Sequence, residues 1–169
     1  MARMPMVRQW QLAGPEDTER LGAALAAACP WEASGPRLAY LSGELGSGKT
    51  TLVAALLHAL GIAEPVRSPS YALLELYALP DGLGAVHVDC YRLQGAEELE
   101  AVGLRDYFRD RSLLLIEWPE QVGGALPDPD LALQLQVQGE GRSCRVVAHS
   151  SVGEQWLSAT VYPQTSPLN

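Results

Sequence analysis

The sequence has a single lysine, a single asparagine and only three cysteines. Cys29, Cys90 and Cys144 are too few and too scattered for a disulfide framework or a zinc site, so we expect reduced thiols in a cytoplasmic protein. No apolar run approaches the roughly 18 residues that span a bilayer, which argues against a membrane protein. Basic residues are also scarce. The 12 basic and 20 acidic residues give a formal charge of −8, which argues against direct binding of nucleic acid.

The length of 169 residues suits one folded domain. Hydrophobic residues make up 47% of the chain and charged residues 19%, as in an ordinary globular protein. We expect a single domain over residues 1–161 and a flexible tail over residues 162–169.

Hydrophobic periodicity and turn residues predict strands that alternate with helices. The predicted strands are residues 6–12, 37–42, 70–77, 84–89, 112–117, 131–137 and 145–148. The predicted helices are residues 15–28, 50–60 and 97–102, the last of them extended by residues 105–109. Residues 112–117 form an apolar run closed by an acid, which is typical of a central strand buried on both faces. The pattern predicts an α/β fold with some antiparallel strands.

Residues 43–50, GELGSGKT, match the phosphate-binding pattern G-x-x-x-x-G-K-[ST] between a predicted strand and a predicted helix. Glycines let backbone N–H groups converge on phosphate oxygens, and the helix N-terminus adds its positive dipole end. Lys49 is the only lysine beside eleven arginines, and its compact ammonium group reaches phosphates where a guanidinium is bulkier. The nucleotide contacts expected in this segment are Leu45, Gly46, Ser47, Gly48, Lys49, Thr50 and Thr51.

Two of the predicted strands end with a carboxylate residue, Asp89 in one and Glu117 in the other. Magnesium takes oxygen ligands, so the Thr50 hydroxyl and the Glu117 carboxylate are the expected metal ligands. Asp89 is expected to position the attacking water or to act as a base, the alternative being a structural role in a turn. His87 lies on the same strand face as Asp89, where a lone histidine is more often structural. Lys49, Asp89 and Glu117 are therefore the expected catalytic residues.

A polar loop, residues 67–71, follows the glycine-rich loop and the predicted helix after it. The hydroxyls of Ser68 and Ser70 are expected to approach the γ-phosphate, as such loops do in other proteins with this motif. A simple Ser-Pro turn is the alternative. Arg67 and Arg92 are alternative candidates for the cation that stabilises the transition state.

The sequence also indicates which base the bound nucleotide carries. Guanine-specific GTPases use an Asn-Lys-x-Asp element, which is absent because the only asparagine is Asn169 and the only lysine is Lys49. Adenine is therefore the expected base, and ATP or ADP with Mg²⁺ the expected cofactors.

Four segments carry a family resemblance. They are residues 43–51 (GELGSGKTT), 66–71 (VRSPSY), 87–93 (HVDCYRL) and 115–120 (LIEWPE). In order and spacing they resemble the TsaE family, small P-loop ATPases of bacterial tRNA threonylcarbamoyladenosine biosynthesis. The resemblance covers roughly residues 15–125.

This resemblance implies a P-loop NTPase-like mixed sheet flanked by helices, binding of ATP and Mg²⁺, and weak hydrolysis by the protein alone. It also implies a complex with TsaD and TsaB that forms N6-threonylcarbamoyladenosine in tRNA, the tRNA being held mainly by the partners. It places Thr18 near the nucleotide and Arg142 beside the adenine, and it makes Ser68–Ser70 a switch. Ser70 stands where the family usually has threonine, which retains the hydroxyl.

Two other functions compete with this interpretation. A nucleoside or nucleotide kinase shares the glycine-rich loop, and Arg105, Arg109 and Arg111 are candidates for the arginine-bearing lid that a kinase needs. A nucleotide-gated assembly module is the other alternative. Release of free phosphate without an acceptor favours the ATPase, and acceptor-dependent transfer favours the kinase. Partner binding that depends on ATP and survives loss of hydrolysis favours the assembly module.

Overall fold

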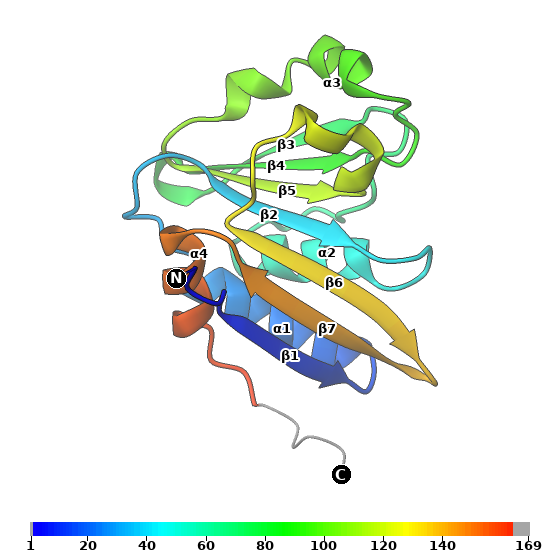
Figure 1. Ribbon diagram of the computed structural model, residues 1–169, viewed down its shortest axis with the longest axis vertical. Helices are drawn as coiled ribbons and strands as arrows, with labels where there is room; N and C mark the ends of the chain where they lie inside the picture. Colours follow the sequence, from blue (N-terminus) through cyan, green and yellow to red (C-terminus); the bar gives the residue numbers. More distant parts are fainter. Residues whose placement is uncertain (1, 164–169) are drawn as a thin grey trace.

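Seven strands form one mixed sheet, in the order β1-β7-β6-β2-β5-β4-β3, in a computed structural model that describes residues 2–163 (Figure 1). The strands are β1 (Val7–Leu12), β2 (Arg37–Ser42), β3 (Leu74–Ala78), β4 (Gly84–Asp89), β5 (Ser112–Glu117), β6 (Leu131–Gln138) and β7 (Gly141–Ala148). The α-helices are α1 (Pro15–Ala28), α2 (Lys49–Ala59), α3 (Ala96–Val102) and α4 (Ser151–Ala159). Three 3₁₀ turns are η1 (Pro80–Gly82), η2 (Leu104–Tyr107) and η3 (Pro119–Ala125).

The central strands β6, β2, β5 and β4 run parallel, and β7, β1 and β3 add antiparallel pairs at the two sides. The expected α/β fold, a mixed sheet flanked by helices, is confirmed. Parallel strands end at the same edge of a sheet, so the segments that follow β2, β4 and β5 are brought together there.

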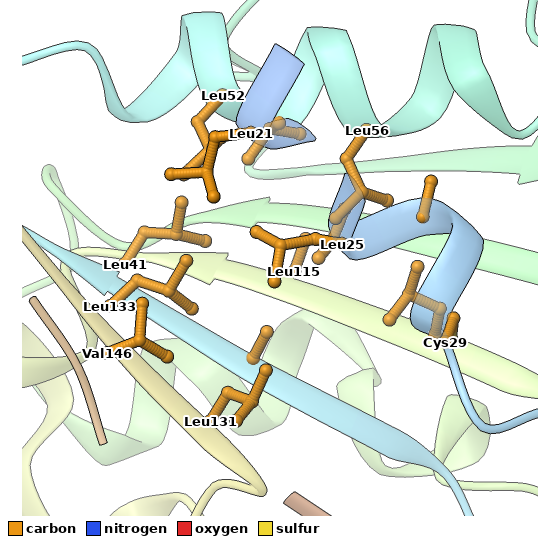
Figure 2. Packing of buried hydrophobic residues seen from close by; sticks show 14 of the residues in the cluster. Leu21, Leu25, Cys29, Leu41, Leu52, Leu56, Leu115, Leu131, Leu133 and Val146 are labelled. Carbon is orange, nitrogen blue, oxygen red and sulfur yellow. The ribbon is translucent and has the colours of Figure 1, made fainter. Parts of the chain in front are cut away.

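The two faces of the sheet bury separate hydrophobic clusters. On one face Leu115 of β5 packs with Leu25 of α1 and Leu56 of α2, as Figure 2 shows. On the other face Ile116 packs with Leu99 of α3 and with the η3 turn. Successive β5 residues thus point to opposite faces, and both are buried. The prediction that residues 112–117 form a central strand is confirmed.

Close helix packing holds α2 against the sheet. A Cβ atom on Gly22 of α1 would lie 2.5 Å from the Cβ of Ala55 in α2, so only glycine permits this approach. Helix α4 packs against α1 and β7, and the indole N–H of Trp156 donates to the Leu25 carbonyl at 2.9 Å. These contacts hold α1, α2 and α4 together over one face of the sheet.

Three predicted elements need correction. The strand predicted over residues 145–148 is the second half of β7, which already begins at Gly141. The strand predicted over residues 70–77 is β3, which begins only at Leu74, because a turn precedes it in which Leu73 has a φ of 66°. The predicted helix 97–102 does not continue through 105–109. Gly103 ends α3 in the left-handed conformation with a φ of 75°, and η2 follows as a separate turn.

The C-terminal part holds an element that the sequence reading missed. Helix α4 begins after Ser150, whose hydroxyl oxygen accepts a hydrogen bond from the Gly153 N–H at 2.9 Å. After it, the Tyr162 ring packs edge-on against Trp10 at 6.0 Å. The predicted tail therefore begins with an anchored residue, and its residues 164–169 lie outside the described part of the chain. Within residues 2–163, none of the helices combines the length and the apolar character needed to cross a membrane.

Candidate functional site

The glycine-rich loop joins the end of β2 to the start of α2. Gly46 and Gly48 have φ values of 78° and 103°, a region that side chains disfavour. At Gly43, whose φ is 146°, a Cβ atom would lie 2.4 Å from the Leu135 carbonyl oxygen and 2.6 Å from the Ser47 hydroxyl. The loop therefore packs tightly against β6 and curls around the N-terminus of α2.

Lys49 is the first residue of α2 and is only 5% exposed. Its Nζ donates to the carbonyl oxygens of Gly43 at 2.6 Å and Glu44 at 2.9 Å, and it lies 4.3 Å from the centroid of the Trp118 ring. Burial lowers the pKa of the Lys49 ammonium group, and the Glu117 carboxylate is the largest opposing influence. The predicted phosphate-binding cation thus sits at the centre of the loop, among acceptors rather than in open solvent.

Thr50 and Glu117 meet beside this cation. The Thr50 hydroxyl donates to Oε1 of Glu117 at 2.9 Å, and Glu117 is 1% exposed. Because Asp89 and Glu117 are register partners in the parallel pair β4–β5, both carboxylates stand at the same sheet edge. Two residues predicted from different parts of the sequence as metal ligands are therefore in direct contact.

This pair fits a magnesium ion. A hydroxyl that donates its one hydrogen to Glu117 keeps lone pairs for a metal. Mg²⁺ commonly takes one or two protein oxygens together with waters and phosphate oxygens. Within residues 2–163 there is no cluster of three or more His, Cys, Asp or Glu side chains suited to a metal. The Thr50–Glu117 pair therefore suits a metal held jointly with a phosphate ligand.

Asp89 connects the polar loop to the site. Its Oδ2 accepts a short hydrogen bond from the Ser68 hydroxyl, and its Oδ1 accepts from the Tyr91 N–H at 2.9 Å. The loop predicted to approach the γ-phosphate is therefore tied to the end of β4. Ser70 lies two residues further on and is half-buried.

The two candidate arginines differ in their surroundings. Arg67 is exposed beside Ser68. The guanidinium carbon of Arg92 lies 4.6 Å from the centroid of the Tyr71 ring, which is 88% exposed. Both arginines remain available at the surface, so the geometry favours neither as the catalytic cation.

A pocket of about 220 Å³ adjoins the loop on its other side. It gathers four predicted nucleotide contacts: Thr18 from α1, Gly48 from the loop, Thr51 from α2 and Arg142 from β7. One guanidinium nitrogen of Arg142 donates to the Gly46 carbonyl at 3.1 Å, which joins the β6–β7 hairpin to the loop. The predicted contact Leu45, by contrast, does not line this pocket, and it is 66% exposed.

Sequence reasoning assigned no role to Trp118. Its backbone lies in the left-handed region, with φ 57° and ψ 47°, and its ring contacts both Lys49 and the Tyr91 ring, the latter at 4.9 Å. A non-glycine residue in this conformation is uncommon and clusters at functional sites. Its position directly after Glu117 was the available signal, but residue type alone does not predict the backbone angles.

The sheet order, the curled loop between β2 and α2, and the helices on both faces define this chain as an α/β protein with a P-loop NTPase-like mixed sheet. The model of the family described as threonylcarbamoyl adenosine biosynthesis protein TsaE matches residues 12–146. The chain therefore belongs to the TsaE family.

Individual relatives agree with this assignment. The chain is 40% identical to the tRNA threonylcarbamoyladenosine biosynthesis protein TsaE of Haemophilus influenzae over 72% of this chain and 77% of that protein. It is 31% identical to TsaE of Bacillus subtilis over 88% of each chain. The crystal structure of Bacillus subtilis YdiB superimposes with a TM-score of 0.74 and 25% identity, and the match covers 93% of this chain and 95% of YdiB.

Proposed function

We propose that this protein is a Mg²⁺-dependent ATP-binding protein and a weak ATPase that supports formation of N6-threonylcarbamoyladenosine in tRNA. The observation that carries the proposal is the meeting of Lys49, Thr50 and Glu117 at the mouth of the glycine-rich loop. A buried ammonium group, a hydroxyl and a carboxylate within one such loop are the parts that bind a nucleotide with its magnesium. The names of the relatives supply the biosynthetic context.

In this proposal each residue has a defined task. The loop N–H groups of residues 45–51 and the Lys49 ammonium group hold the β- and γ-phosphates. Thr50 and Glu117 hold the metal, which when bound neutralises charge that develops on the phosphate oxygens. Asp89, fixed by the Ser68 hydroxyl and the Tyr91 N–H, orients or deprotonates the attacking water. Ser68 and Ser70 form the segment that senses the γ-phosphate.

The pocket beside the loop is the proposed adenosine site. Thr18 and Thr51 line it with small polar groups, and the planar guanidinium of Arg142 offers a flat surface to a base. The hydrogen bond from Arg142 to Gly46 couples this pocket to the phosphate loop. ATP and ADP are therefore the proposed ligands.

The biological role that we propose requires partners. The chain acts with homologues of TsaD and TsaB, and the tRNA is held mainly by them, because this chain carries a formal charge of −8. The three cysteines are buried and unpaired, which suits a reducing compartment such as the cytoplasm.

The kinase alternative depends on three arginines that each have a partner within the chain. Arg105 is 2.7 Å from the Glu100 carboxylate, and Arg109 and Arg111 donate to backbone carbonyls. An assay with the purified protein decides between the two. Release of phosphate from ATP without an added acceptor, increased by TsaD and TsaB homologues, supports the ATPase. Transfer of the γ-phosphate only to an added nucleoside or nucleotide would refute it.

Partner binding is a separate test of the proposal. Immobilised protein should retain the purified TsaD and TsaB homologues, and the amount retained should differ between ATP and ADP. The assembly-module alternative makes two predictions for an Asp89→Ala variant that no longer hydrolyses ATP. The variant should retain the TsaD and TsaB homologues as the unmodified protein does, and it should still support tRNA modification. Loss of modification in that variant would exclude this alternative.

A further inference from the structure

A buried histidine lies directly behind the proposed metal carboxylate. His87 of β4 is 0% exposed, and its Nε2 is 2.6 Å from Oε2 of Glu117. His87 is the register partner of Leu115, two residues before Glu117 on β5, so both side chains point to the face that α2 covers. The contact is therefore built into the sheet.

The two oxygens of Glu117 have different principal partners. Oε2 lies 2.6 Å from Nε2 of His87 in the interior, and Oε1 is the nearer acceptor of the Thr50 hydroxyl, at 2.9 Å against 3.2 Å for Oε2. A carboxylate needs a donor, so Nε2 is the protonated nitrogen of His87. Nδ1 of His87 is buried and has no hydrogen-bond partner in the described part of the chain. Among residues 2–163, the bond to Glu117 is thus the one polar contact that compensates the burial of this ring.

The geometry points to His87 as a positioning residue for the proposed magnesium site, an inference that rests on the proposed function. By holding Oε2 in the interior, the Nε2–H fixes the rotamer of Glu117 and keeps Oε1 toward Thr50 and the metal. A hydrophobic side chain would fill the same space without orienting the carboxylate. Outer partners of this kind typically contribute 10- to 100-fold to metal affinity.

The test is a calorimetric titration of Mg²⁺ into the full chain saturated with ADP, so its readout is metal affinity and not turnover. His87→Leu keeps an apolar volume and removes the donor, and it should weaken Mg²⁺ binding by about 10- to 100-fold. ADP affinity measured with EDTA should not change. His87→Gln places an amide N–H near the position of Nε2 and should restore most of the Mg²⁺ affinity.

A matched control separates positioning from stability. Val86→Ala shortens a buried residue of the same strand that packs on the opposite face, so it should lower the melting temperature and leave Mg²⁺ affinity unchanged. Equal Mg²⁺ affinity in His87→Leu and the unmodified protein would overturn the inference, and so would an equal loss in Val86→Ala.

If His87→Leu does not fold, the pair His87→Asn and His87→Gln decides. The shorter amide of asparagine does not reach Glu117, so only glutamine should retain strong Mg²⁺ binding, and equal affinity in both would overturn the inference. Failure of the proposed function is distinguishable, because in that case the unmodified protein itself would bind neither ADP nor Mg²⁺.

Discussion

Replacing Gly43 with alanine tests whether the loop is held in its curled form by close packing on β6. The new Cβ would lie 2.4 Å from the Leu135 carbonyl oxygen and 2.6 Å from the Ser47 hydroxyl, both well inside normal contact distance. Because one obstacle is backbone, the strand or the loop must move. The φ of 146° adds strain that glycine avoids.

The magnitude follows from these two contributions. A side chain forced into such a backbone region costs about 1–3 kcal/mol, and overpacking costs about another 1–3 kcal/mol. For a chain of this size each kcal/mol lowers the melting temperature by about 2–4 °C, so Gly43→Ala should melt roughly 4–24 °C lower. ADP should also bind more weakly, because the Gly43 carbonyl and the Ser47 hydroxyl are both within hydrogen-bond distance of the Lys49 ammonium group.

Gly35→Ala is the matched control for this experiment. Gly35 also has a positive φ, 78°, but nothing lies within 4 Å of the position of its Cβ. It should therefore show only the conformational cost, about 1–2 kcal/mol, and no change in ADP affinity. Thermal melts by circular dichroism and calorimetric titration with ADP measure both quantities. If the two variants matched in melting temperature and in ADP affinity, the packing argument for the loop would be refuted.

Three further predictions concern the carboxylates and the thiols. Glu117→Gln should raise the Mg²⁺ concentration needed for ADP binding by at least about tenfold, because it removes the charge of a proposed ligand; an unchanged Mg²⁺ titration would contradict the assignment. Asp89→Ala should leave ATP affinity intact and lower phosphate release by about 10²–10⁴-fold; full turnover would remove Asp89 from the mechanism. Burial raises the pKa of all three cysteine thiols to about 12, from about 9 in the unfolded chain. The folded chain therefore keeps protons that the unfolded chain loses above pH 9, and the free energy of unfolding should fall by up to about 1.4 kcal/mol per thiol for each pH unit between 9 and 12. Urea unfolding at pH 8, 9 and 10 checks this, with Cys144→Ala expected to give a shallower slope, and a constant urea midpoint would contradict it.

Much of the fold could be predicted because its determinants are local. The apolar run of β5, the proline and acidic residues in the first turn of α1, and the glycine-rich motif before α2 each specify an element from neighbouring residues. The sequence placed Asp89 and Glu117 at the ends of two strands, and parallel strands end at one edge of a sheet. That these two strands are neighbours, with Asp89 and Glu117 as register partners, is seen only in the structure.

The remaining features depend on tertiary contacts. The left-handed Trp118 and its contact with Lys49 follow from packing against the loop, not from residue preference. Helix α4 is short, and its Trp156 is recognisable as a core residue only once Leu25 of α1 lies beside it. Gly103 could have been predicted as the end of α3, because a glycine directly after a helix is a usual stop signal.

The central claim is that residues 43–50 bind the phosphate chain of a nucleotide with Lys49 against its β- and γ-phosphates. The most direct measurement compares the affinities of AMP, ADP and ATP for the unmodified protein and for Lys49→Ala. The unmodified protein should bind ADP and ATP much more tightly than AMP, and Lys49→Ala should lose this preference. A Lys49→Ala variant that still prefers ADP and ATP to AMP by the same factor would contradict the claim.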